Sequence, residues 1–142
     1  MFKRGDVYEV ELPEDKTSRM QGGRRPIVIL SNDLNNKYSE IIQFAPLSAQ
    51  LKKLNLPVHV VVSDRILKKQ SVVLLEQLEK IDKNKLIDMT VSKIGQLSEE
   101  SMNRVSLGVA AQLGINIPSL FFMIQNNNNL QIAQWNVLTN EF

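Results

Sequence analysis

Cysteine is absent from this chain, which excludes disulfide bonds and thiolate metal sites. Histidine is nearly absent: with His59 alone, no pair of histidines can share the acid and base steps of a reaction. An excess of one charge is lacking too, because 17 basic residues against 15 acidic ones leave a net charge of +2. No apolar run is long enough to span a membrane, and the N-terminus has no apolar signal region, so we expect a cytoplasmic protein.

What remains is the composition of one soluble globular domain, with 43% hydrophobic and 23% charged residues in a chain of 142. Its basic residues fall mainly in segments that we predict to be loops. If the fold gathers these loops on one face, that face suits a polyanion; a solvated surface of mixed charge is an alternative of equal weight. The basic loop residues are Lys3, Arg4, Lys16, Arg19, Arg24, Arg25, Lys52, Lys53, Lys68 and Lys69.

Short apolar segments bounded by turn residues predict a series of β-strands. The segment Pro13–Gly23 is polar and ends in two glycines, which indicates a long loop, and Pro46 is expected to stop the third strand. Asn32–Asn36 and Asp82–Lys85 have the composition of turns. The predicted strands are Val7–Leu12, Pro26–Leu30, Ile41–Ala45, Val58–Val62, Ser71–Leu75 and about Leu86–Val91.

The pattern then changes to that of one amphipathic helix. Ser98 is a good N-cap, acidic residues follow it in the first turn, and Gly114 is placed to end the helix. A run of strands followed by such a helix predicts an α+β fold, mostly β, built on a small barrel. The apolar stripe of the helix consists of Met102, Val105, Val109 and Leu113.

The C-terminal part differs in composition, so we divide the chain into a domain at 1–115 and an extension at 116–142. Leu120–Ile124 is strongly apolar, and we expect it to pack on the barrel or on a partner subunit, because such a patch is rarely left in water. Asn126–Asn129 is a low-complexity asparagine run that we expect to be mobile.

Two motifs place an arginine and a hydroxyl where they can converge. Gln21–Pro26 carries Arg25 between a glycine loop and an apolar strand, and Pro46–Gln50 carries Ser48 just after another strand. At one end of a small sheet, a guanidinium and a hydroxyl can together bind a phosphodiester through hydrogen bonds.

With Arg4–Tyr8, Ser31–Asp33 and Leu75–Gln77, these motifs resemble the MazF/PemK (Kid) family of toxin endoribonucleases, from about Lys3 to about Ile115. The resemblance implies a Src-homology-3-like (CcdB/PemK-type) barrel with a C-terminal amphipathic helix. It also implies a sequence-specific mRNA interferase of a type II toxin–antitoxin system, acting without metal or other cofactor on single-stranded RNA. Such a toxin works as a twofold dimer and is neutralised by a small antitoxin with an acidic segment.

Family cleavage uses the RNA's own 2′-hydroxyl and leaves a 2′,3′-cyclic phosphate and a 5′-hydroxyl. In that scheme Arg25 stabilises the extra negative charge of the phosphorane, and Ser48, where relatives usually have threonine, bonds a non-bridging oxygen. The structural alternatives are an ion pair of Arg25 with an acid such as Glu76, and a turn serine bonded to its own backbone.

The general base is left open. Many relatives carry glutamate where this chain has Met20, so Glu76 is the nearest candidate by family position, with an ion pair at a strand end as the equal alternative. His59 is expected to be a half-exposed strand residue. No acidic residues have metal-ligand spacing. Expected contacts to RNA backbone or base edges are Arg19, Gln21, Gly22, Gly23, Arg24, Gln50, Lys52, Lys53 and Gln77.

Two other functions are alternatives on the same fold. A CcdB-like, non-enzymatic gyrase inhibitor would lack the arginine–hydroxyl pair and would end in Trp-Gly-Ile, whereas this chain has the pair and ends Asn140-Glu141-Phe142. A passive nucleic-acid-binding barrel is supported only by the basic loops.

Overall fold

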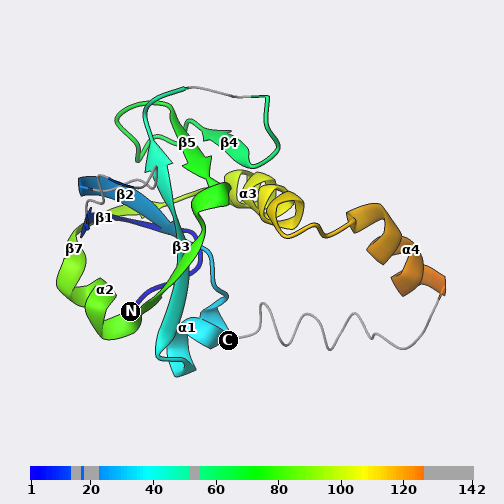
Figure 1. Ribbon diagram of the computed structural model, residues 1–142, viewed down its shortest axis with the longest axis horizontal. Coiled ribbons are helices and arrows are strands. Elements are labelled where there is room, and N and C mark those ends of the chain that lie inside the picture. Colours follow the sequence, from blue (N-terminus) through cyan, green and yellow to red (C-terminus); the bar gives the residue numbers. More distant parts are fainter. Residues whose placement is uncertain (14–16, 18–22, 52–54, 127–142) are drawn as a thin grey trace.

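The computed structural model describes residues 1–13, 17, 23–51 and 55–126, and its body is one antiparallel sheet with short helices around it (Figure 1). Within this part of the chain the sheet has seven strands, on the path β4-β5-β3-β2-β1-β7, with β6 paired to β3. The path ends at β4 and β7, so the barrel is open. The strands are β1 Asp6–Leu12, β2 Gly23–Ile29, β3 Ile41–Ser48, β4 His59–Val62, β5 Ser71–Leu74, β6 Glu79–Asp82 and β7 Thr90–Gln96.

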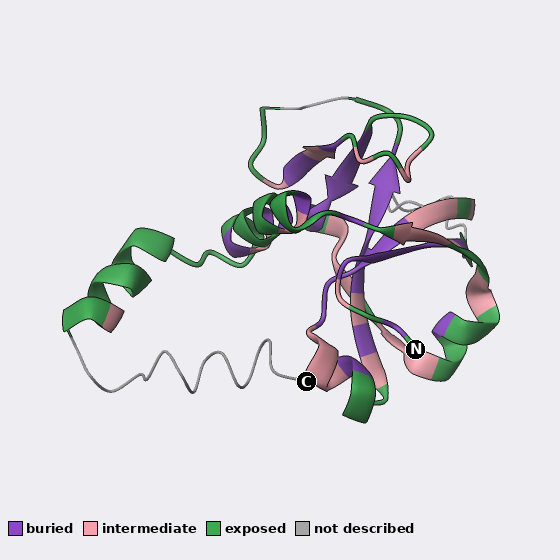
Figure 2. Cartoon of the chain, turned by 180° about the vertical axis from the view of Figure 1, so that it is seen from behind, coloured by how far each residue is buried: buried purple, intermediate pink, exposed green. Residues whose placement is uncertain are grey.

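The long strand β3 joins the parts of the sheet. Its first half pairs with β6, its middle with β2, and its last residues with β5. Because side chains alternate along a strand, β3 supplies Phe44 to one core cluster and Leu47 to the other. Figure 2 shows the buried residues concentrated along these central strands. The predicted α+β class, mostly β, is confirmed.

The helices in the described part of the chain are α1 Asp33–Tyr38, the 3-10 turn η1 Leu75–Gln77, α2 Lys83–Met89, α3 Glu99–Gln112 and α4 Ile117–Asn126. The expected boundaries of α3 are confirmed. The Ser98 side chain accepts the Ser101 backbone N–H at 3.2 Å. At the other end Gly114 has φ +71°, and the Ile115 N–H reaches the Ala110 carbonyl at 2.8 Å, a Schellman-type end.

The stripe predicted on α3 is only partly correct. Val105 is fully buried, and Met102 and Val109 pack against the same core cluster, but Leu113 is 60% exposed. The helix approaches η1 and β4 through Gly108, where an added Cβ would lie 2.3 Å from Leu75 Cδ1.

Two predicted turns are short helices, so those predictions were wrong. The Asn32 side chain accepts the Asn35 N–H at 2.8 Å and starts α1, and Asp82 accepts the N–H groups of Asn84 and Lys85 and starts α2. Asn and Asp side chains bond the backbone in the same way in a turn and at a helix N-cap, which explains the error. The strand predicted at Leu86–Val91 is therefore mostly α2, and β7 begins only at Thr90.

The prediction that Pro46 stops the third strand was also wrong. Pro46 is the last residue of β3 in register with β2, opposite Ile27, and β3 then continues beside β5 through Ser48. A proline has no N–H to donate, and this one lies where β3 changes its partner.

Of the two expectations for Leu120–Ile124, packing on the barrel was wrong, and packing on a partner subunit stays a prediction. The segment lies in α4, which has no buried residue, with Phe121 at 61% and Phe122 at 68% exposed (Figure 2). No single helix among the described residues is long and apolar enough to cross a membrane; α3 and α4 pass on length and composition only together, and they are bent by 97°. Mobility was expected for Asn126–Asn129. For Asn126 this was wrong, because it is the last residue of α4 and its side chain donates to the Phe122 carbonyl at 2.8 Å; Asn127–Asn129 lie outside the described residues.

Candidate active site and nucleic-acid interface

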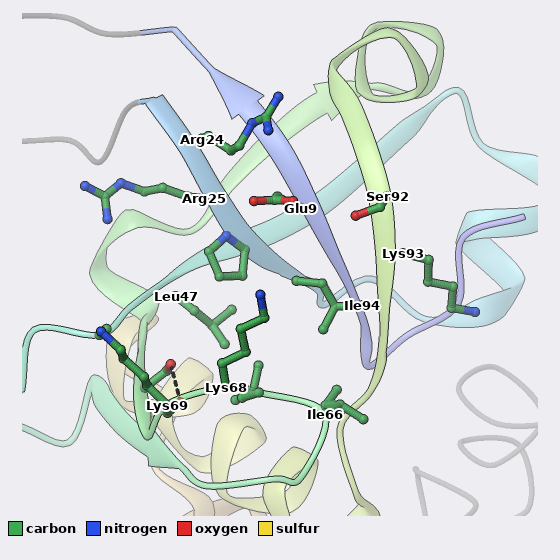
Figure 3. A pocket seen from close by; sticks show the side chains of 14 residues that line it. Glu9, Arg24, Arg25, Leu47, Ile66, Lys68, Lys69, Ser92, Lys93 and Ile94 are labelled. Atoms are coloured by element: carbon green, nitrogen blue, oxygen red, sulfur yellow. Dashed lines mark hydrogen bonds between the residues drawn. The ribbon is translucent and has the colours of Figure 1, made fainter.

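Arg24 and Arg25 lie on β2, not in a loop before it, because the strand already begins at Gly23. Arg24 is opposite Glu11 of β1, and its Nε lies 3.4 Å from Glu11 Oε2 in an exposed ion pair. Arg25 is opposite Val10 and is partly buried. Since neighbours on a strand point in different directions, the two side chains diverge, although both residues line the cavity described below. Figure 3 shows their side chains pointing apart.

The strand register brings Arg25 and Ser48 to the same end of the sheet. The β2–β3 ladder pairs Ile27 with Pro46, and continuing that register by two steps beyond the paired residues would set Arg25 opposite Ser48. Residues opposite each other across two strands lie on the same face. The ladder itself stops at Ile27, because β3 there turns to β5 and pairs Ser48 with Val72.

Ser48 is 5% exposed, and its Oγ accepts the Gln50 backbone N–H at 3.2 Å. This is the turn-serine bond weighed above as the structural alternative. It uses only an acceptor site of the hydroxyl, whose own hydrogen can still be donated to a phosphate oxygen. Ser48 is not among the residues that line the neighbouring cavity.

That cavity has a volume of about 500 Å³ and lies beside Arg25 (Figure 3). Side chains of Leu47, Ile66 and Ile94 form apolar parts of its lining, and Glu9 is its only carboxylate among the described residues. A hollow with several cations and one anion suits a polyanion such as RNA. The cationic residues that line it are Arg24, Arg25, Lys68, Lys69 and Lys93.

The sequence marks Lys68 and Lys69 only as basic loop residues and does not single out Glu9 or Lys93. Glu9 is opposite Pro26 on β2 and Ser92 on β7. Only the pairing of β1 with both strands brings these residues to one hollow, and no local motif in the sequence carries that information.

Glu76, the candidate base, lies on η1 and bonds His59. Its Oε1 is 2.6 Å from His59 Nε2, so Glu76 pairs with a strand residue, as in the structural alternative given above. The His59 side chain is 6% exposed, and the expectation of a half-exposed histidine was wrong because its ring is covered and held by this bond. Neither residue, nor Gln77 beside them, is among the lining residues of the cavity.

The other predicted RNA contacts divide into two groups. Gly23 starts β2 with φ +76°, and Gln50 is exposed directly after β3. The remaining ones, Arg19, Gln21, Gly22, Lys52 and Lys53, lie outside the described residues, as does Met20.

The segment Arg4–Tyr8, which contributed to the resemblance, has a structural role. The Arg4 guanidinium donates to the Leu30 carbonyl and, at 2.6 Å, to Ser106 Oγ, which ties α3 to the sheet. Desolvation by burial lowers the pKa of Arg4, against the opposing effect of Asp33.

Asp6 is buried and holds a small network. It accepts from the Tyr8 hydroxyl at 3.2 Å and lies 3.4 Å from Lys93 Nζ. Burial, with the Asp6 charge and hydrogen bond, raises the pKa of Tyr8 to about 12. Among the described residues, no group of three or more His, Cys, Asp and Glu side chains is placed to hold a metal ion.

Comparison with known proteins agrees with this geometry. Residues 3–113 match the family model described as PemK-like, MazF-like toxin of type II toxin-antitoxin system. A protein named Endoribonuclease MazF from Staphylococcus saprophyticus subsp. saprophyticus is 39% identical over 117 residues, covering 81% of this chain and 93% of its own.

Solved structures share the fold. MazF from Deinococcus radiodurans has a TM-score of 0.65 at 20% identity, over 79% of this chain and 96% of its own. An endoribonuclease in complex with its cognate antitoxin, from Mycobacterial species, has a TM-score of 0.65 at 21% identity, over 82% and 98%. The resemblance noted in the sequence is confirmed: this chain belongs to the PemK-like, MazF-like family of type II toxin–antitoxin toxins.

Proposed function

We propose that this protein is a metal-independent endoribonuclease that cleaves single-stranded RNA, including mRNA, at specific sequences and is neutralised by a cognate antitoxin. Its membership of the family and its 39% identity to a protein named Endoribonuclease MazF support the activity. The site assignment is supported by the position of Arg25 in the lining of a cavity rich in cations, and by the β2–β3 register, which directs Arg25 and Ser48 to the same end of the sheet when it is continued past Ile27 and Pro46.

In the proposed reaction the RNA 2′-hydroxyl attacks the adjacent phosphorus, and the bond from phosphorus to the 5′-oxygen breaks. Arg25 stabilises the added negative charge of the phosphorane, because a guanidinium is always charged and can donate two parallel hydrogen bonds. Ser48 donates its hydroxyl hydrogen to a non-bridging oxygen. The products are a 2′,3′-cyclic phosphate and a 5′-hydroxyl end.

The bond between Glu76 and His59 makes Glu76 a poor candidate for the base, because its carboxylate is already engaged outside the cavity. Binding of the RNA strand also uses the basic, amide and glycine residues predicted from the family resemblance. We assign this role to Arg19, Gln21, Gly22, Gly23, Arg24, Gln50, Lys52, Lys53 and Gln77.

We further propose that the protein acts in the cytoplasm as a twofold homodimer. A small barrel with exposed apolar surface fits an isologous pair. The catalytic domain is placed at residues 1–115, and residues 116–142 form an extension whose described part is α4.

The test is to incubate the pure protein with a long single-stranded RNA and map both new ends. Cleavage should persist in excess chelator, and a single 2′-deoxy substitution 5′ to the scissile bond should stop it. Products that carry a 5′-phosphate, or activity lost in chelator, would point to metal-activated water and refute the mechanism.

Variants test the two assigned residues. Arg25→Ala should lower the cleavage rate about a hundredfold or more, and Arg24→Ala, the matched neighbour on the same strand, should weaken binding only mildly. Ser48→Ala should also slow cleavage strongly, whereas Ser48→Thr should keep it. If Arg24→Ala were the more damaging arginine change, the catalytic assignment of Arg25 would be wrong.

A further inference from the structure

The cavity beside Arg25 contains a carboxylate that the proposed chemistry does not use. Glu9 is partly buried on β1 and lies in the midst of the lining side chains in Figure 3. Within the described residues its carboxylate has no hydrogen bond or ion pair. Two cations of the lining pair with other carboxylates, Arg24 with Glu11 and Lys93 with Asp6.

A carboxylate in this position favours a ligand that supplies hydrogen-bond donors. An ionised carboxylate only accepts hydrogen bonds, and it repels a phosphate, which also only accepts them. A partly buried charge with no partner is costly, so an occupant that donates to it gains more than it would at the surface. In an RNA strand the donors are on the base edges and on the ribose 2′-hydroxyls, and the phosphates carry the negative charge.

The other lining residues also form one group that suits a base and one group that suits phosphates. Leu47, Ile66 and Ile94 offer an apolar surface for the flat face of a base. Lys68 and Lys69 are exposed on the segment between β4 and β5 and suit the phosphates on either side of that base. The cavity volume of about 500 Å³ is within the range of small-molecule sites.

Among the described residues, no aromatic side chain lines the cavity, so stacking gives little preference and the choice of base depends on the carboxylate. Guanine offers two adjacent donors on its Watson–Crick edge, N1–H and N2–H, which match the two oxygens of a carboxylate. Adenine and cytosine offer one amino group beside a ring acceptor, and uracil places its single N–H between two carbonyl oxygens.

We propose that this cavity is a base subsite for guanine in the RNA strand. Glu9 accepts hydrogen bonds from the Watson–Crick edge, the aliphatic side chains hold the base, and Lys68 and Lys69 bind the neighbouring phosphates. The inference rests on the proposed function, because it names the substrate base for that same site.

The first experiment measures base preference. A pool of single-stranded RNA with random sequence is cleaved by the unaltered protein, by Glu9→Gln and by the control Glu40→Gln, an exposed site outside the cavity, and the new ends are sequenced. The unaltered protein and Glu40→Gln should select guanine at one position near the cut. Glu9→Gln should lose about tenfold or more of that selection while still cleaving, because a lost bidentate base contact relaxes discrimination.

The second experiment measures phosphate contact. The probe is an RNA that cannot be cleaved because it carries the 2′-deoxy substitution 5′ to the scissile bond. Its binding constant is measured at several salt concentrations for the double variant Lys68→Ala/Lys69→Ala and for the exposed control pair Lys80→Ala/Lys85→Ala. Loss of two phosphate contacts should reduce the slope of log K against log salt by about 1.4, at about 0.7 for each contact on a single strand. The control pair should leave the slope unchanged.

The outcomes separate the two proposals. If the unaltered protein cleaves RNA but selects no guanine, or if Glu9→Gln slows all sequences equally and keeps the preference, the base subsite is refuted; the latter result would make Glu9 a proton-transfer group. If the protein cleaves no RNA, the proposed function fails. Guanine-selective binding of blocked RNA, abolished by Glu9→Gln, would still support the subsite.

Discussion

Gly108→Ala tests how tightly α3 is packed on the sheet. Gly108 is buried in the middle of α3, and an added Cβ would lie 2.3 Å from Leu75 Cδ1, 2.8 Å from Val60 Cγ2 and 3.2 Å from the Pro57 carbonyl oxygen. Leu75 is fully buried, and Val60 is only 8% exposed, so neither side chain has open solvent into which to move.

Two opposing effects set the magnitude. Alanine is favoured over glycine in a helix by about 0.8–1.0 kcal/mol. Forcing an extra methyl group into a packed core costs about 1–3 kcal/mol. The net effect should be a loss of about 1 kcal/mol in the free energy of unfolding, or about 4 °C in Tm for a chain of this size.

The assay is thermal and urea unfolding followed by circular dichroism, with Asn103→Ala as the matched control. Asn103 lies on the exposed face of the same helix, so its change should give only the gain in helix propensity, about 0.5 kcal/mol. A Gly108→Ala variant as stable as the control or more so would mean that α3 has room to move away from β4 and η1. The close contact at Gly108 would then not limit stability.

Other outcomes follow from titrating groups and from α4. Because burial and Asp6 raise the pKa of Tyr8 to about 12, its contribution to stability is complete below about pH 10 and is lost as the pH rises towards 12; Tyr8→Phe should abolish this loss in alkaline unfolding curves. Desolvation alone would raise the pKa of Asp64, but hydrogen bonds from Ser101 and from the start of α3 outweigh the desolvation and lower that pKa. The stability that the Asp64 carboxylate gives is therefore present above about pH 4 and is lost as the pH falls through the lowered pKa. Asp64→Asn should flatten the acid side of the stability curve, and an unchanged acid profile would contradict this role. Truncation after Ile115 removes the exposed α4 but keeps the end of α3, so Tm should change by less than about 2 °C; a large drop would mean that the removed residues pack on the body.

The sequence by itself determined the class of the fold and the family of the chain. Strands such as Val7–Leu12 could be predicted because alternating apolar residues fix which face is buried, and α3 because Ser98 and Gly114 mark its ends. It did not distinguish turns from the short helices α1 and α2, since Asn32 and Asp82 satisfy the backbone alike in both.

Tertiary structure decided which residues meet. Arg25 and Ser48 are far apart in the chain, and only the pairing of β2 with β3 brings the strands that carry them side by side. Glu9 and Lys93 reach the cavity because β1 pairs with β2 on one side and β7 on the other, a long-range pairing that no local pattern encodes. The exposed position of α4 contradicts its apolar composition, because composition predicts that a segment is buried somewhere but does not determine against what.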